Sequence, residues 1–401
     1  MLLFEYKEQK LLNLLKFTGS PFKRFVSTGE IDENIDLISS RQDFLKTIVK
    51  IIEENENFIL PVIADVGVGK THLYWALKHE MYFYNIVYIS LENVYRKFFY
   101  NTYSEFIENM GVEVLRSIAN KLCNEWGALE RKFGFFHVAD IEKVRKVASE
   151  RWTSKYEDST AIHDVIYAIT THQLDPYKKV DAERWLLGEL MGIKELSRLN
   201  LMHDLREKKN SFMMLKVLIE NSNKKSVLFI DDFEKIISII KPPDEETEEV
   251  FDPSWLYGDK TLSEKSSAEK TLDKILQLRK IKGLRIVITL KSQEFYEEIK
   301  KKIEERYKGL SFLLKEPVFL SSFTEEDVYQ FYKENLEYFF RNINYIEYFD
   351  NFQNSYFPLN ESNLKYIFKH SKGNPREIIK LLTIVFNKLT LSNEDFGRVF
   401  R

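Results

Sequence analysis

The stretch ADVGVGKTHL, Ala64 to Leu73, follows directly on the unbroken apolar run FILPVI, Phe58 to Ile63. An apolar run of this length is typical of a strand buried on both faces, as in parallel sheets. Gly67 and Gly69 then predict a turn, and the residues after them predict a helix. A strand, a glycine turn and a helix in this order indicate an α/β fold built on a parallel sheet.

The composition is that of a globular protein. The chain has 401 residues, of which 44% are hydrophobic and 30% are charged, enough for about two or three cores. A net charge of −3 excludes a global basic field that would steer the chain to nucleic acid, and leaves a local patch open. Cys123 is the single cysteine, which excludes an internal disulfide and a thiolate metal cluster. No stretch has the length of a membrane span or of a secretory apolar segment, so we expect a cytoplasmic protein.

Further helices and strands alternate along the chain. In SSRQDFLKTIVKIIEENENF, residues 39–58, the apolar residues have helical spacing, with Ser40 as the N-cap. A second helix is expected from the glycine turn to about Tyr82. Further strands are expected at residues 85–91, 227–230, 283–290 and 316–323. This alternation predicts three αβα layers, a parallel sheet with helices on both faces.

The glycine turn has the chemistry that a bound phosphate requires. In phosphate loops, backbone N–H groups turn inward to hold the anion, a lysine reaches the β and γ oxygens, and the next hydroxyl ligates Mg²⁺. Lys70 and Thr71 supply the lysine and the hydroxyl, whereas Ala64 replaces the first glycine of the usual pattern. The predicted nucleotide-binding loop comprises Ala64, Asp65, Val66, Gly67, Val68, Gly69, Lys70, Thr71 and His72.

A second motif, VLFIDDFE, ends a predicted strand in two carboxylates. Beside the loop, Asp231 would hold Mg²⁺ and its water shell, and the next carboxylate would polarise the attacking water. Asp232 stands at that second position. Glu234, at the start of the following helix, competes for the same role, and the sequence leaves this choice open.

The two motifs together resemble the AAA+ class of P-loop ATPases, in particular its archaeal initiator-like and STAND-like branch, over roughly residues 38–385. ADVGVGKT would be Walker A and VLFIDDFE would be Walker B. RIVITL is similar to the sensor-1 strand, which implies that Thr289 reads the γ-phosphate. GNPREIIKLL is similar to the sensor-2 signature of a helical lid, which implies that Arg376 lies over the nucleotide. The resemblance implies ATP and Mg²⁺ as cofactors and hydrolysis to ADP and phosphate.

The resemblance also implies a division of the chain. We expect an N-terminal lead at residues 1–40, an AAA+ nucleotide-binding domain at 41–323 and a helical lid domain at 324–401. Residues 92–225 carry almost no strand signal, so they predict a helical insertion in the nucleotide-binding domain. The acidic, proline-containing segment 241–268 predicts an exposed loop.

A narrower similarity lies in the insertion. RWLLGELMGIKELSRLNL, residues 184–201, followed by VLFIDDFEKI, is similar to ATP-binding proteins associated with phage-exclusion (BREX) systems. The alternative is that Trp185, Leu186 and Leu187 pack in the core of a helix.

Two basic stretches have a functional and a structural interpretation. Arg306, in KKKIEERYKGL, fills the place of an arginine finger that would act on the nucleotide of a neighbouring subunit. The alternative is a solvated basic helix face. VYRKFFYNTY, residues 94–103, has the aromatic and basic residues that stack bases, and the alternative is packing within the insertion.

The sequence thus predicts a Mg-ATP-binding and ATP-hydrolysing enzyme that acts as a conformational motor or switch. One hypothesis is a homo-oligomer that acts on DNA in replication, transposition or phage defence. Its assembled copies would align basic residues such as Arg96 and Lys97 or Lys300 to Lys302. The alternative is a STAND-like nucleotide switch that signals to a protein partner with little turnover. No membrane association is expected.

Overall fold

The computed structural model describes residues 9–10, 12–14, 21–22, 38–91, 97–132, 135–138, 140–240, 260–306, 311–344 and 356–391. The predicted lead at residues 1–40 lies mostly outside these ranges. No helix among the described residues combines the length and the apolar character needed to cross a bilayer.

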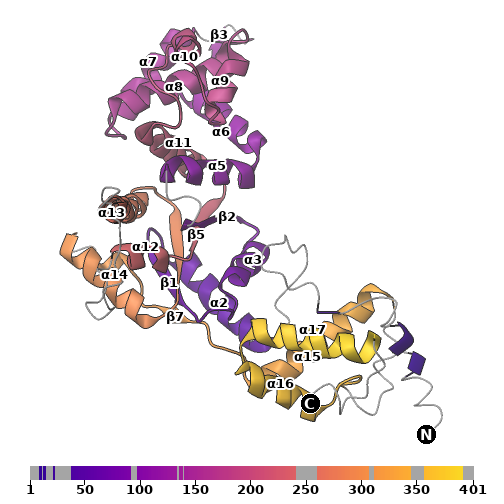
Figure 1. The fold of residues 1–401 in the computed structure, drawn as a ribbon. Coiled ribbons are helices and arrows are strands. Elements are labelled where there is room, and N and C mark those ends of the chain that lie inside the picture. Colours follow the sequence, from indigo (N-terminus) through magenta and orange to yellow (C-terminus); the bar gives the residue numbers. More distant parts are fainter. Residues whose placement is uncertain are drawn as a thin grey trace.

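A five-stranded parallel sheet is the centre of the fold (Figure 1). The strand order is β2-β5-β6-β1-β7, and every neighbouring pair is parallel. The strands are β1 Ile59–Ile63, β2 Tyr84–Ser90, β5 Lys225–Asp231, β6 Leu284–Leu290 and β7 Val318–Phe319. The prediction of an α/β fold with a parallel sheet is therefore confirmed.

Helices cover both faces of this sheet, and alternate residues of β1, β5 and β6 enter two different cores. In β1, Leu60 and Val62 pack with α2 (Ser39–Glu54) and α3 (Lys70–Glu80). Ile59 and Ile63 enter the core on the other face. That core includes residues of α12 Glu234–Ile240, α13 Lys260–Leu278 and α14 Gln293–Arg306. Every β1 residue is buried, as the apolar run predicts.

A mainly helical insertion separates β2 from β5 in the sequence. Its helices are α5 Phe98–Met110, α6 Val112–Glu125, α7 Ile141–Thr153, α8 Ser159–Leu174, α9 Lys179–Leu186, α10 Ile193–Leu199 and α11 Lys208–Asn221. It lies beyond the β2 edge of the sheet, at the opposite end of the molecule from α17 (Figure 1). The predicted helical character is confirmed for the described residues, with one addition, the antiparallel hairpin of β3 Leu129–Lys132 and β4 Phe135–Val138.

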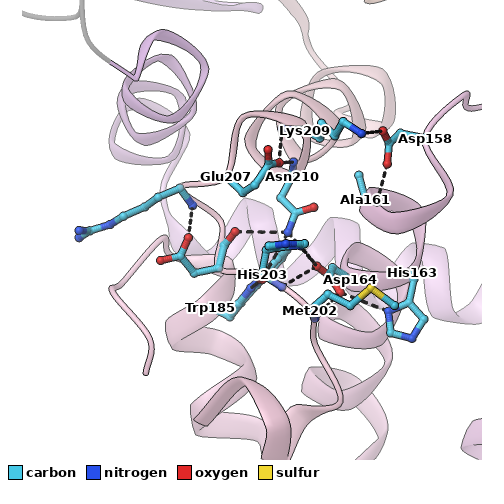
Figure 2. A network of polar contacts seen from close by, with 12 residues as sticks. Asp158, Ala161, His163, Asp164, Trp185, Met202, His203, Glu207, Lys209 and Asn210 are labelled. Atoms are coloured by element: carbon cyan, nitrogen blue, oxygen red, sulfur yellow. Dashed lines mark hydrogen bonds and ion pairs between the residues drawn. The ribbon is translucent and has the colours of Figure 1, made fainter. Parts of the chain in front are cut away.

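A buried carboxylate organises the insertion (Figure 2). Asp164 of α8 is fully buried and accepts hydrogen bonds from the backbone N–H groups of Met202 (2.8 Å) and His203 (3.0 Å). It also accepts one from the side-chain amide of Asn210 (3.0 Å). The indole N–H of Trp185 donates to the His203 carbonyl (2.9 Å). These contacts fix the loop after α10 against α8. Trp185 is fully buried in this packed core.

Three helices follow the sheet: α15 Glu325–Asn342, α16 Glu361–Ser371 and α17 Pro375–Leu391. Their apolar faces form a hydrophobic core of their own, which Phe22 and Ile38 join from the N-terminal side. The helical character predicted from Thr324 onward is confirmed for the described residues.

Two details of the predicted secondary structure are wrong. α2 begins after Ile38, so Ser40 is not the N-cap; its hydroxyl instead donates to Asp327 Oδ1 of α15 (2.8 Å). α13 begins at Lys260, so residues 260–268 of the predicted acidic loop are helical. Residues 241–259 of that loop lie outside the described residues.

Candidate functional site

The predicted phosphate loop lies at the carboxyl edge of the sheet. The loop begins where the Ala64 N–H donates to the Leu290 carbonyl (3.0 Å), which joins the ends of β1 and β6. It ends at Gly69, whose φ of +115° is in the left-handed region, directly before the first residue of α3. The first N–H groups of a helix have no partner within the helix, and they attract anions. The geometry therefore aims the start of α3 at the edge of a parallel sheet where ligands bind.

Three predicted site residues meet at Asp231. This carboxylate is buried at the end of β5 and accepts hydrogen bonds from the hydroxyls of Thr71 (2.7 Å) and Thr289. It also accepts the Asp232 N–H (3.0 Å) and the Tyr88 hydroxyl (3.1 Å). The structure thus joins the end of the loop, the end of β5 and β6 through one carboxylate.

Tyr88 is a member of this cluster that the sequence analysis missed. Burial and the neighbouring Asp231 raise the pKa of its phenol, so the hydroxyl stays protonated and donates to the carboxylate. The one available signal was its place near the end of β2, which pairs with β5. A tyrosine in an apolar strand gives no indication by itself of which residue it contacts.

Lys70 is buried beneath the loop. Its ammonium donates to the carbonyl of Ala64, the first residue of the loop (2.8 Å). An ammonium group has three N–H donors, and this bond uses one of them. This bond connects the first residue of the loop to the first residue of α3.

Asp232 and Glu234 have different surroundings. Asp232 has φ of +56°, and its carboxylate forms an ion pair with Lys235 (3.1 Å). Glu234 is 2% exposed, and neither of its carboxylate oxygens has a hydrogen-bond partner in the described part of the chain. Lys291 lies 3.6 Å from one of them. Burial raises the pKa of Glu234, while Lys70 and Lys291 act in the opposite direction.

The start of α17 contacts the loop directly. The Asn374 side chain donates to the Val66 carbonyl (2.7 Å), and the Arg376 N–H donates to the Gly67 carbonyl (3.2 Å). Gly67 has φ of +85°, and a Cβ atom there would lie 2.6 Å from Asn374 Oδ1 and 3.1 Å from Arg376 Cβ. A glycine is therefore required at position 67 for this contact. The predicted lid residue Arg376 is exposed and stands beside the loop.

The other side of the loop is held by Arg41 of α2, which the sequence analysis did not select. Its guanidinium donates to the carbonyls of Val68 (3.2 Å) and Ser321 (2.8 Å). It also lies 4.9 Å from the centre of the Phe323 ring. An arginine in the first turn of a helix is common on protein surfaces, so the sequence held no signal for this contact.

The remaining predicted residues contribute less to this geometry. Asp65 and Val66 are exposed at the tip of the loop, and His72 is half-buried on α3. Arg306 is the last residue of α14, and its side chain lies outside the described part of the structure.

The residues present fit a magnesium ion bound together with a phosphate. Mg²⁺ keeps several waters and is held in such sites by one or two protein oxygens plus phosphate oxygens. The Thr71 hydroxyl and the Asp231 carboxylate, 2.7 Å apart, are a donor set of this kind. Within the described ranges, no cluster of three or more His, Cys, Asp or Glu residues is placed to hold a metal by protein ligands alone.

Comparison with protein-family models and with curated proteins finds no match to this chain. The resemblance to AAA+ ATPases therefore rests on the sequence motifs alone.

Proposed function

We propose that the chain is a P-loop ATPase of the AAA+ class, with a three-layer αβα nucleotide-binding domain, which binds and hydrolyses Mg-ATP. The observation that carries this proposal is the contact of Thr71 with Asp231 and of Asp231 with Thr289. These three side chains come from distant parts of the sequence, and Walker A, Walker B and sensor 1 would require them together.

Each residue has a task in the proposed reaction. The backbone N–H groups at the start of α3 and the Lys70 ammonium bind the β- and γ-phosphates, and Thr71 and Asp231 hold the metal. Bound Mg²⁺ would neutralise charge on the transferring phosphoryl group. Thr289 lies beside Asp231, where a polar side chain can read the γ-phosphate. Such a reaction needs positioning and charge stabilisation more than covalent chemistry.

Glu234 is the better candidate for the residue that takes the proton from water. A general base works best when its pKa lies near the working pH, and burial raises the pKa of Glu234 toward that range. The Asp232 carboxylate is instead engaged with Lys235.

The output of hydrolysis is a change in the position of the C-terminal helices. α17 bonds to the carbonyls of Val66 and Gly67, so movement of the loop around a phosphate changes the surface on which α17 rests. This coupling suits a motor in a DNA-related process, assembled as a homo-oligomer. It equally suits a STAND-like switch, because two hydrogen bonds link the lid to the loop itself.

The proposal is tested by ATP turnover measured against Mg²⁺ concentration. Asp231→Asn is expected to require more Mg²⁺ than the wild type and to turn over more slowly, because a metal-binding charge is lost. Asp43→Asn, an exposed aspartate on α2, is the matched control and should behave as the wild type. An Asp231→Asn protein with an unchanged Mg²⁺ profile would exclude this metal site. Stimulation of turnover by DNA favours the motor, and tight nucleotide retention without stimulation favours the switch.

A further inference from the structure

A groove outside the phosphate-loop site opens between the sheet and the insertion. Its volume is about 580 Å³. It is bounded by the end of α3, the start of β2, the α5–α6 junction and the turn from α11 to β5. β2 is an edge strand of the sheet, so the groove runs along a border that is not covered by another strand among the described residues.

The groove is positively charged, although the whole chain is slightly acidic. Lys78, Lys121 and Lys224 line it, and none of them forms an ion pair within the described part of the chain. The Lys224 ammonium donates to the Tyr82 carbonyl (2.9 Å), which fixes that side chain at the groove wall. The lining carboxylate of Glu113 is already paired with Arg116. The local excess of positive charge therefore favours an anionic ligand.

Tyr82, which lines the groove, forms an exposed aromatic pair with the next residue, Phe83. Tyr82 and Phe83, in the turn between α3 and β2, are 63% and 66% exposed. Their ring centroids lie 3.9 Å apart. Two large rings held together in solvent give up apolar burial, and such surfaces often mark binding sites. Rings of this kind are platforms on which nucleic-acid bases stack, because every base has a flat π face.

We propose that this groove binds single-stranded nucleic acid. The three lysines would neutralise backbone phosphates, and the Tyr82–Phe83 pair would stack unpaired bases. Polar side chains in the groove, among them Asn109, Ser117 and Asn223, can hydrogen-bond to sugars and base edges. A duplex keeps its bases stacked inside, so it cannot use the aromatic pair. The proposal does not depend on the ATPase activity, since the groove shares no residue with the phosphate loop.

An acidic peptide that adds a strand to β2 is the competing occupant, and the groove favours it less. Tyr84, Asn85 and Ile86 are the β2 residues that line the groove. This exposes too short a stretch of edge for a strand to pair along it. Exposed aromatic rings also contribute more to base stacking than to backbone pairing.

The test is fluorescence anisotropy of a labelled oligothymidylate titrated with the full chain at low salt. Wild-type affinity is expected to fall with salt with a slope of about −2 in log units, for three phosphates at about −0.7 each. Tyr82→Ala combined with Phe83→Ala should weaken binding at least about tenfold, because stacking is lost. Tyr177→Ala, which removes a tyrosine that is 89% exposed on the insertion, is the matched control and should bind as the wild type.

The contribution of positive charge to binding is tested with two pairs of lysine substitutions. Lys78→Gln with Lys121→Gln should reduce the magnitude of the salt slope by about 1.4, because two phosphate contacts are lost. Lys365→Gln with Lys369→Gln on α16, at the other end of the molecule from the insertion, should leave the slope unchanged. The proposal is overturned by a wild type that does not bind, by equal binding of duplex and single strand, or by an affinity that only the α16 pair alters. It is also overturned if an acidic peptide, but not the oligonucleotide, binds in a way that depends on Tyr82 and Phe83.

Discussion

Asp231 is the side chain on which the candidate site depends most. Its two carboxylate oxygens accept from Thr71, Thr289, Tyr88 and the Asp232 N–H, so each neighbour is held by a charged acceptor. Hydrogen bonds to a charged group are stronger than neutral ones, and a buried charge is costly when its partners are removed. The cluster therefore holds Thr71, at the start of α3, against the ends of β5 and β6.

The rate of ATP turnover in two variants distinguishes the two candidate general bases, Asp232 and Glu234. Glu234→Gln is expected to slow ATP hydrolysis about 10²- to 10⁴-fold with little change in Mg-ATP binding, as for loss of a general base. Asp232→Asn should slow it much less, because this carboxylate is engaged with Lys235. Single-turnover hydrolysis and nucleotide binding on both variants make the comparison. If Asp232→Asn shows the large loss and Glu234→Gln does not, water is activated by Asp232.

Glu234 also predicts a dependence of stability on pH. Burial raises its pKa in the folded chain above the ordinary value of 4.5. As pH rises from 4.5 through that raised pKa, the folded state loses a proton that it held more tightly than the unfolded state, so wild-type stability falls. Glu234→Gln carries no charge, so its stability should not fall in this range and should exceed that of the wild type at about pH 8. Below pH 4.5 the difference should vanish.

Urea denaturation of the two proteins across this pH range measures the effect. A constant difference between them, or a Glu234→Gln protein that is less stable at the higher pH, would mean that Lys291 offsets the burial of the carboxylate.

Among the described helices, α17 matters most to the proposed function, because its first residues bond to the predicted phosphate loop. Asn374 accepts from the Arg376 N–H (3.1 Å) and the Glu377 N–H (3.4 Å) and so caps α17, while its amide donates to Val66. Pro375 follows at the first helical position, where a missing N–H costs nothing. One side chain therefore both begins the helix and attaches it to the loop.

Asn374→Ala tests this double role. Loss of an N-cap should cost about 1 kcal/mol of unfolding free energy. Asn360→Ala is the matched control, because Asn360 caps α16 and, within the described residues, makes no contact with the loop. Both variants are expected to lose similar stability in urea denaturation, and Asn374→Ala alone should change Mg-ATP affinity. Equal affinity in the two variants would separate the lid contact from nucleotide binding.

The buried strands could be predicted from the sequence, and the contacts across elements could not. β1, β5 and β6 are apolar runs buried on both faces, which leaves little ambiguity in their periodicity. The β3–β4 hairpin was missed because LERK and FFHV are only four residues each and LERK is mostly charged. The start of α13 was missed because its polar residues suggest a loop, although glutamate, lysine and alanine favour helices.

The residues of the candidate site also fall into two groups, those marked by a local sequence motif and those that act through distant contacts. Lys70, Thr71 and Asp231 belong to local motifs, so their types and spacing carried the prediction, whereas Thr289 was implied by the resemblance of RIVITL to a sensor-1 strand. Arg41 and Tyr88 act through contacts with residues far away in the sequence, and no local pattern marks such partners. Serine is a favoured N-cap residue, which explains the prediction for Ser40. Its hydroxyl instead donates to Asp327, because α15 lies beside α2 in the folded chain.

In the whole molecule, the sheet lies between two helical parts with different contacts. The insertion meets the β2 edge, where the proposed nucleic-acid groove opens, and α17 meets the phosphate loop at the far end (Figure 1). We therefore expect a ligand at the loop to act first on the C-terminal helices, through the bonds of Asn374 and Arg376 to the loop. A nucleic acid in the groove would contact the opposite side of the sheet.

We also predict that Mg-ATP controls the assembly of the chain into oligomers. If Arg306 acts on the nucleotide of a neighbour, Mg-ATP should favour oligomers, and Arg306→Ala should lose hydrolysis while it retains nucleotide binding. Lys301→Ala on the same helix is the control and should keep turnover. Sedimentation velocity with and without a slowly hydrolysed ATP analogue gives the mass. A monomer with full activity in every nucleotide state would rule out an arginine supplied by a second copy.

Binding of Mg-ATP, measured by isothermal titration calorimetry, tests the phosphate-loop proposal most directly. The wild type is expected to bind saturably, with one site per chain. Lys70→Ala removes the buried ammonium that the loop encloses and should abolish measurable binding, whereas Lys46→Ala, an exposed lysine on α2, should bind as the wild type. Saturable binding that Lys70→Ala leaves unchanged, or a wild type that binds no Mg-ATP, would contradict the account.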